Sequence, residues 1–468
     1  MTATTRTPHG DELAPHPSGA APAGTASDAP GHRRSGRWID HWDPEDATFW
    51  HDGGRRTASR NLRVSIFAEF IGFAVWALWS IVVPQLPAAG FALTIDQQFW
   101  LVAVPSLVGA TLRIPYTFAV PLFGGRNWTV VSALLLLLPT VALALVVQRP
   151  DTSFGVLLAV AALAGFGGGN FASSMANISF FYPEREKGKA LGLNAAGGNL
   201  GTAAVQLAVP LVITVGAGVA LERVGLMMVP FIVLAAVLAW RCMDNLSAAR
   251  ADPRSFAAAA RNKHTWIISF LYIGTFGSFI GYAGAFPMLL GAQFPGVGVS
   301  IAFLGALVGS LTRPLGGVIA DRVGGTPVTI AAYGTMALGA LGAIQALERD
   351  SFGLFFGSFL LLFVATGVGN GSTYRMIPAV FQASVAADGA PGDVRARARQ
   401  AAAGCIGIAG AVGAFGGFLI PRGFAASTSM TGSLVPALWA FIGMYAVMAL
   451  VAWAVYRRPG AAFAAARI

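Results

Sequence analysis

Long apolar stretches alternate with short polar connections along most of this chain. Stretches of about twenty mainly apolar residues recur between Leu62 and Tyr456, and each is long enough for a helix to cross a hydrocarbon core of roughly 30 Å. Their approximate bounds are 62–86, 97–122, 128–147, 154–181, 188–214, 224–243, 265–291, 299–320, 327–347, 352–382, 400–421 and 434–456. The pattern predicts an all-α integral membrane protein with twelve transmembrane helices.

The remaining segments set the predicted domain organisation. Residues 62–243 and 265–456 form two six-helix bundles, joined by a basic cytoplasmic linker at 244–264 and followed by a cytoplasmic tail at 457–468. Residues 1–61 are rich in Pro, Gly, Ala and Ser, which predicts a mostly disordered cytoplasmic tail. Within that tail, the aromatic and acidic segment 38–46 either docks on the cytoplasmic face of the protein or stays free.

Composition and charge support a membrane protein. The chain is 55% hydrophobic and only 11% charged, whereas an ordinary soluble protein has roughly 25% charged residues. The net charge of +10 would suggest a nucleic-acid partner in a soluble protein, but here the basic residues lie in short loops. We therefore expect membrane lipid as the surroundings and no nucleic acid.

The loops that hold most of the basic residues predict the orientation, because cytoplasmic loops carry an excess of Lys and Arg. The loops assigned to the inside contain Arg126, Arg185, Lys187, Lys189, Arg250, Arg254, Arg261, Lys263, Arg322, Arg395, Arg397 and Arg399. Those assigned to the outside contain Arg149, Arg223, Arg349 and Arg422. We expect a multi-pass protein of the cytoplasmic membrane with both termini in the cytoplasm.

An internal repeat divides the chain into two related halves. Leu107-Val108-Gly109 followed by Arg113 recurs, 200 residues later, as Leu307-Val308-Gly309 followed by Arg313. The same offset relates Gly124-Gly125 to Gly324-Gly325, and Gly167-x-Gly169-Asn170 to Gly367-x-Gly369-Asn370. Such a repeat predicts a substrate site near the middle of the membrane, between the halves.

Arg113 and Arg313 are the strongest candidates for that site. A charge at this depth costs several kcal/mol unless it faces a cavity or a partner. The only carboxylate well inside a span is Glu69, so two arginines share at most one acid, which favours binding of a diffusing anion. Guanidinium groups offer bidentate hydrogen bonds to oxyanions. Nitrate and nitrite suit two opposed arginines better than phosphate does, but composition alone does not choose the anion.

Polar residues in the glycine-rich fourth and fifth spans form a second group. These asparagines, which are costly in lipid, either line the central path or hydrogen-bond across helices; they are Asn170, Asn177, Asn194 and Asn199. The spans contain no His/Cys cluster, nucleophile elbow or metal spacing. Neither an enzyme nor a cofactor is expected.

Several motifs resemble the nitrate/nitrite porter family of the major facilitator superfamily. Its signature region is similar to the segment Ala-Ser-Ser-Met-Ala-Asn-Ile-Ser-Phe-Phe-Tyr-Pro at 172–183, which runs into Lys-Ala-Leu-Gly-Leu-Asn at 189–194. Segments 369–378 and 404–421 look like its C-terminal counterparts, and the resemblance covers nearly all twelve spans.

The resemblance implies two pseudo-symmetric six-helix bundles, the major facilitator fold, and a set of site residues. Arg113 and Arg313 would clamp nitrate or nitrite, and the other matching positions are Tyr272, Phe276 and Phe171, with polar contacts from Asn194 or Asn199. Porters of this fold usually work as monomers. The implied function is secondary active transport of nitrate or nitrite by alternating access.

Glu69 bears on how transport is driven. Chains with an acid here resemble the subgroup associated with proton-coupled nitrate uptake, so protons are a second expected ligand; the alternative role is a salt bridge to an arginine such as Arg375. Proton symport is the leading expectation, nitrate/nitrite exchange the second, and a nitrate-binding sensor a third. Gating or interface roles are expected for Arg375 and for Asp321 and Arg322 of the superfamily loop Gly317-x-x-x-Asp321-Arg322-x-Gly324.

Overall fold

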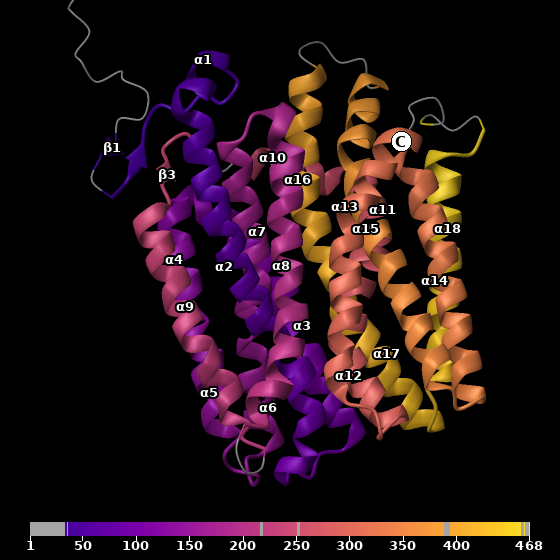
Figure 1. The fold of residues 1–468 in the computed structure, drawn as a ribbon. Helices are drawn as coiled ribbons and strands as arrows, with labels where there is room; N and C mark the ends of the chain where they lie inside the picture. Colours follow the sequence, from indigo (N-terminus) through magenta and orange to yellow (C-terminus); the bar gives the residue numbers. More distant parts are fainter. Residues whose placement is uncertain are drawn as a thin grey trace, which may run out of the picture.

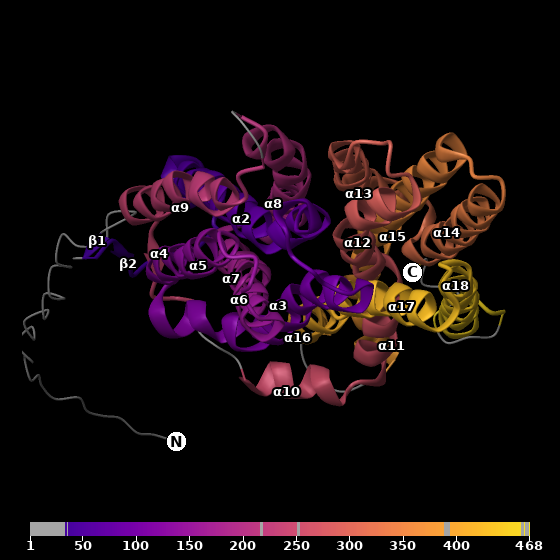
Figure 2. The same ribbon diagram turned by 90° about the horizontal axis from the view of Figure 1, so that it is seen from below.

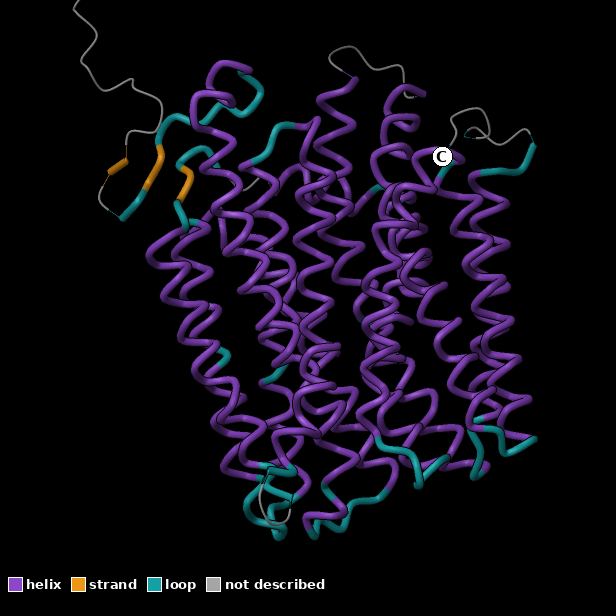
Figure 3. The backbone as a smooth tube through the Cα atoms, viewed as in Figure 1, coloured by secondary structure: helices purple, strands orange, loops and turns teal. Residues whose placement is uncertain are grey.

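The computed structural model describes residues 33–34, 36–215, 219–249, 253–387, 394–459, 463 and 468. In that part of the chain, twelve helical segments are long and apolar enough to cross a membrane, which confirms the predicted all-α transmembrane fold. The helices run between two faces where the loops gather (Figure 3). We call the face that carries α1 (Ala47–Phe49), α10 (Pro253–Arg261) and Ile468 the tail face.

Six spans form each half, and the halves stand side by side (Figures 1 and 2). The first half contains α2 (Arg55–Val82), α3 (Ile95–Phe123), α4 and α5 (Gly125–Leu135 and Leu137–Val146), α6 and α7 (Phe154–Leu163 and Gly165–Phe181), α8 (Glu184–Ile213) and α9 (Glu222–Cys242). The second contains α11 (Lys263–Tyr272), the π-helical turn η4 (Ile273–Gly277), α12 (Ser278–Gln293), α13 (Phe303–Val323), α14 (Gly325–Glu348), α15 (Phe352–Ala387), α16 and α17 (Val394–Ala414 and Gly416–Thr431) and α18 (Val435–Tyr456).

The repeat in the sequence is a repeat in the backbone. Helix α3 ends at Gly124 with φ +85° and ψ 144°, and α13 ends at Gly324 with φ +95° and ψ 148°. Positive φ values of this kind are open to glycine and strained for residues with a Cβ atom. The two halves therefore use the same helix stop, 200 residues apart, and this places Arg113 and Arg313 at equivalent depths on equivalent helices.

The described residues of the predicted N-terminal tail pack against the first half. Helix α2 begins at Arg55, seven residues before the predicted span, because Ala58 and Asn61 are fully buried and packing extends the helix beyond the apolar stretch. The ring of Trp42 lies 5.2 Å from Phe49 and 5.3 Å from Phe181. In the part that the structure describes, segment 38–46 thus docks; residues 1–32 and 35 lie outside the described residues.

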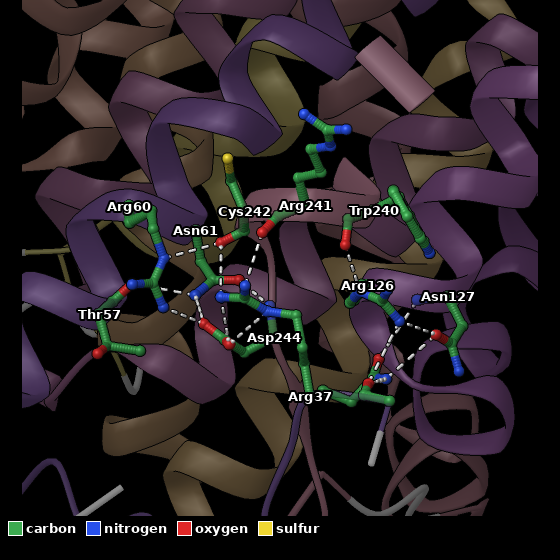
Figure 4. Close-up of polar contacts among 12 residues, drawn as sticks. Arg37, Thr57, Arg60, Asn61, Arg126, Asn127, Trp240, Arg241, Cys242 and Asp244 are labelled. Carbon is green, nitrogen blue, oxygen red and sulfur yellow. Dashed lines mark hydrogen bonds and ion pairs between the residues drawn. The ribbon is translucent and has the colours of Figure 1, made fainter. Parts of the chain in front are cut away.

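A short sheet ties this segment to the end of α9. Strand β2 (Trp38–Ile39) pairs antiparallel with β1 (Arg33–Arg34) and parallel with β3 (Asn245–Leu246). Beside the sheet, Arg37 donates to Asp244 at 2.9 Å, and Arg60 forms an ion pair with the other oxygen of the same buried carboxylate (Figure 4). Asp244 thereby fixes the docked segment to α2 and α9.

On the face opposite the tails, polar contacts join the two halves. Arg422 of α17 forms an ion pair with Asp96 of α3 at 2.8 Å, and its guanidinium carbon lies 4.2 Å from the ring centre of Trp100. The buried amide of Gln206 on α8 donates to the carbonyl of Ala283 on α12 at 2.7 Å. Beside the Gln206 contact lies a cavity of about 30 Å³, lined in part by Ala283 and Ser106.

We expect Arg422→Asp to loosen this junction, since it replaces an attraction to Asp96 by a repulsion. A cysteine placed at Ser106, in a background without Cys242 and Cys405, should then react with a maleimide in detergent about threefold to tenfold faster, because a partly exposed ion pair with a cation–π contact stabilises by about 1 kcal/mol. The swapped pair Asp96→Arg/Arg422→Asp should restore slow labelling. Equal labelling rates in all three proteins would show that the ion pair does not hold the halves together.

Candidate anion site between the two halves

Arg113 lies in the interior of α3 and reaches across the interface between the halves. Its side chain is fully buried. Nε donates to the carbonyl of Gly168 on α7 at 3.1 Å, and Nη1 donates to the carbonyl of Gly410 on α16 at 2.7 Å. The third nitrogen, Nη2, has no hydrogen-bond partner among the described residues. One donor of a buried cation is therefore free to take an acceptor.

Arg313 occupies the equivalent place on α13 in the second half. Its Nη2 lies 3.5 Å from the phenol oxygen of Tyr272, and its Nη1 lacks a hydrogen-bond partner in the described structure. Tyr272 donates its own hydrogen to Oδ1 of Asn370 at 2.8 Å, which fixes the direction of the phenol group. Each arginine of the pair thus keeps one buried, unused nitrogen.

Two phenylalanine rings, one from each half, lie within 6 Å of both arginines. The guanidinium carbon of Arg113 is 4.5 Å from the centre of Phe171 and 4.9 Å from that of Phe276; for Arg313 both distances are 5.9 Å. The two rings stack at 6.0 Å, and Tyr272 stacks on Phe276 at 5.0 Å. Cation–π contacts of about 0.5–2 kcal/mol partly compensate the buried charges.

No carboxylate neutralises this pair within the described structure. None of the ion pairs there includes Arg113 or Arg313. Glu69 on α2 is buried and interacts electrostatically with Arg113, but its two oxygens have no partner in hydrogen-bonding geometry. Two positive charges against one acid leave the region with a net positive charge, which attracts an anion.

The alternative salt bridge between Glu69 and Arg375 is wrong for this conformation. Arg375 of α15 instead forms an ion pair with Asp321 of α13, and both side chains are about half exposed. Asp321 and the exposed Arg322 stand at the end of α13, on the tail face. The Arg375–Asp321 pair joins two helices of the same half, so the gating role of these three residues stays a prediction.

The structure separates the two asparagines proposed for the fifth span. Asn194 donates to the hydroxyl of Ser174 on α7, in the same half, at 2.5 Å. Asn199 is buried with neither amide atom bonded, and it shares a helix face with Thr202 and Gln206, which point toward the second half. Asn199 is therefore the better placed of the two for the central site.

Some contacts of the site were not predicted from the sequence. Asn370, the acceptor for Tyr272, could have been found as the repeat mate of Asn170. Trp76 and Tyr374, whose ring centres lie 5.6 Å from Arg113 and 5.9 Å from Arg313, could not be told from ordinary packing aromatics. The bond from Arg113 to the carbonyl of Gly410 could not be predicted, because every residue has a backbone carbonyl.

Comparison with known proteins identifies the family. The family model described as Major Facilitator Superfamily matches residues 66–418. The chain is 40% identical to the nitrate/nitrite transporter NarU of Escherichia coli (strain K12), over 89% of this chain and 96% of that protein. This chain belongs to the nitrate/nitrite porter family of the major facilitator superfamily. A second relative, the probable nitrate/nitrite antiporter NarK2 of Thermus thermophilus, is 37% identical over 91% of the porter described here and 98% of its own length.

Solved structures support the fold of the porter. The inward-open xylose transporter XylE from E. coli matches with a TM-score of 0.64 at 15% identity, covering 84% of this chain and 95% of that one. A crystal structure of a D-xylose–proton symporter gives a TM-score of 0.62 at 16% identity, covering 85% and 97%. These findings confirm the family and the major facilitator fold that the motifs imply.

Tyr272→Phe tests the polar part of the site. It removes the acceptor for Arg313 and the bond to Asn370 but keeps the ring stacked on Phe276, so nitrate affinity should fall about tenfold, as expected for a lost hydrogen bond to a charged group. Binding is measured by titration calorimetry of the purified porter. Tyr282→Phe is the control. It removes a buried phenol group that is bonded to the hydroxyl of Tyr445 at 2.5 Å and makes no contact with the two arginines. Equal losses in both variants would contradict a role specific to the site.

Proposed function

We propose that this porter moves nitrate and nitrite across the cytoplasmic membrane, with the tail face in the cytoplasm, working as a monomer by alternating access. The observation that carries the proposal is the pair Arg113 and Arg313, one from each half, buried against the same two phenylalanine rings and each with an unused nitrogen. A site assembled from both halves is occupied or emptied as the halves move.

The shape of the site favours a small planar anion. An oxyanion between the free nitrogens would accept hydrogen bonds from both guanidinium groups while its faces contact the rings of Phe171 and Phe276. Nitrate and nitrite have the required charge and planarity, and the relatives NarU and NarK2 are described as transporters of these ions. A tetrahedral phosphate has no flat face to lie against these rings.

In the proposed mechanism of alternating access, the bound anion neutralises part of the positive charge of Arg113 and Arg313. The two guanidinium groups repel one another, so an empty site resists the approach of the halves. A bound anion attracts both arginines and removes most of that repulsion. Arg113 also bonds to the carbonyl of Gly410 in the opposite half through Nη1, and its Nη2 stays available to the anion. Loaded porter therefore changes conformation more readily than empty porter.

Substitution of the arginines tests this function. In proteoliposomes, Arg113→Ala and Arg313→Ala should each slow uptake of labelled nitrate at least a hundredfold, because each leaves one buried charge and removes half of the anion's donors. Arg113→Lys keeps the charge and loses the planar fork, so a smaller loss, about tenfold, is expected. Arg149→Ala, in an exposed loop, is the matched control. Uptake at the wild-type rate in either alanine variant refutes the proposal.

We propose proton symport as the driving reaction, with Glu69 as the proton carrier and nitrate/nitrite exchange as the alternative. The support is a buried carboxyl group beside Arg113 whose oxygens have no hydrogen-bond partner in the described part of the chain. Protonation removes the cost of burying that charge once the anion has partly neutralised Arg113. The sensor hypothesis predicts binding without movement of nitrate, so uptake by the purified porter excludes it.

The two modes of coupling give different results when a pH gradient is imposed on vesicles that contain no nitrite. A symporter takes up nitrate together with protons, whereas a pure exchanger shows no net uptake. Glu69→Gln should abolish uptake driven by the pH gradient, because the amide cannot take up or release the proton, and it should keep nitrate/nitrate exchange within about threefold of wild type. Retention of pH-driven uptake in Glu69→Gln would exclude this residue as the proton carrier.

A further inference from the structure

Glu69 is the last member of a row of polar residues along α2. The row consists of Thr57, Asn61, Ser65 and Glu69, spaced four residues apart. This spacing places them along one side of the helix, about 6 Å apart at 1.5 Å per residue. Asn61, Ser65 and Glu69 are buried, and Thr57 is partly exposed. Burying three successive polar side chains is costly unless they contact one another, other polar groups or water.

The tail-face end of the row is connected to side chains that reach solvent. Asn61 donates to the carboxylate of Asp244 at 3.0 Å, and its amide oxygen accepts from the backbone N–H of Asp244 at 2.8 Å. Asp244 in turn pairs with Arg37 and Arg60, whose side chains are 27% and 30% exposed. Figure 4 shows these groups converging on Asp244. Protons therefore have a polar, partly exposed entrance about two turns of α2 away from Glu69.

In the middle of the row, Ser174 of α7 links the polar residues of three helices. Its hydroxyl accepts from Asn194 of α8 at 2.5 Å and lies 3.2 Å from the hydroxyl of Ser65. A serine hydroxyl has one donor and two acceptor positions. When Ser65 donates to it, both acceptor positions of Ser174 are filled and its hydrogen is free for Glu69. In the contact between Ser65 and Ser174 either hydroxyl can be the donor, and a proton relay requires hydrogen bonds that can reverse in this way.

The deep end of the row faces the anion site. Arg113 of α3 is the charged group that acts on Glu69, and the hydroxyl of Ser174 interacts with the carboxyl group without reaching full hydrogen-bonding geometry. From α8, Gly198 packs on the Glu69 side chain, and a Cβ atom there would stand 2.7 Å from Cγ of the glutamate. One turn further along α2, Phe73 lines a cavity together with the apolar residues Phe279 and Ile280 of α12. Apart from Arg113, Ser174 is thus the polar side chain that interacts with Glu69 among the described residues.

We propose that Ser174, held by Asn194 and Ser65, passes protons between Glu69 and the tail face along the polar row of α2. The inference rests on the proposed function, since it supplies the path for its proton. Ser174 gives its hydroxyl hydrogen to the Glu69 carboxylate while it accepts one from the hydroxyl of Ser65, which in turn accepts one from a hydronium ion on the tail side. One proton moves, Ser174 ends as a hydroxyl, and release follows the reverse order. Ser174 is a positioning residue that acts through Glu69.

The test compares Ser174→Ala with Ser173→Ala in proteoliposomes. Ser173 is its buried neighbour on α7, and its hydroxyl bonds to the carbonyl of Asn170 in the same helix. Ser174→Ala should slow nitrate uptake driven by a pH gradient at least tenfold, which is less than the roughly hundredfold or larger effect typical of groups that transfer protons directly. Nitrate/nitrate exchange, which needs no proton, should stay within about twofold. Ser173→Ala should leave both rates unchanged, and Ser174→Thr, which keeps the hydroxyl, should restore coupled uptake.

Each other outcome counts against the relay. Coupled uptake at the wild-type rate in Ser174→Ala overturns it while leaving proton symport intact. Loss of exchange along with uptake in Ser174→Ala, without restoration by Ser174→Thr, assigns Ser174 a structural role. Uptake driven by a sodium gradient in place of the pH gradient shows that the pocket takes a metal cation. Wild-type porter that exchanges nitrate but takes up no protons overturns the relay and proton symport together. Wild-type porter that moves no nitrate overturns the transport function itself.

Discussion

The structure depends on how two positive charges are kept between two apolar bundles. Arg113 and Arg313 are held by backbone carbonyls, a phenol and the faces of Phe171 and Phe276, and none of these groups carries a negative charge. Dipoles and ring quadrupoles reduce the cost of burying a cation without cancelling its charge. The site therefore keeps its attraction for an anion, which a carboxylate in each half would remove.

Other features of the fold follow from this arrangement. The matching helix stops at Gly124 and Gly324 place the arginines at equivalent depths, and the contacts of Asp96, Arg422 and Gln206 join the halves on the face opposite the tails. Glu69 lies beside one arginine only, so the pseudo-symmetry fails in charge at that point. Because of this asymmetry, protonation of Glu69 changes the charge beside Arg113 only, whereas the anion contacts both arginines.

Much of the fold and part of the site could be predicted from the sequence. The spans follow from hydropathy, and the offset of 200 residues follows from glycine positions that the backbone requires, as the positive φ values of Gly124 and Gly324 show. The early start of α2 at Arg55 could not be predicted, because the packing of Ala58 and Asn61 against residues far along the chain decides it. Carbonyl partners such as Gly410, and the different directions of Asn194 and Asn199, depend on how the helices are rotated, which residue type does not reveal.

The claim that one anion binds both arginines is tested most directly by a double-mutant cycle on nitrate affinity. Arg113→Lys, Arg313→Lys and the double variant would be titrated with nitrate by calorimetry alongside the wild-type porter. If a single anion bridges the pair, the two substitutions are coupled by about 1 kcal/mol or more, since residues that share a partner are not additive. Losses that add to within about 0.5 kcal/mol would mean that the arginines act independently, and would contradict the shared site on which this account depends.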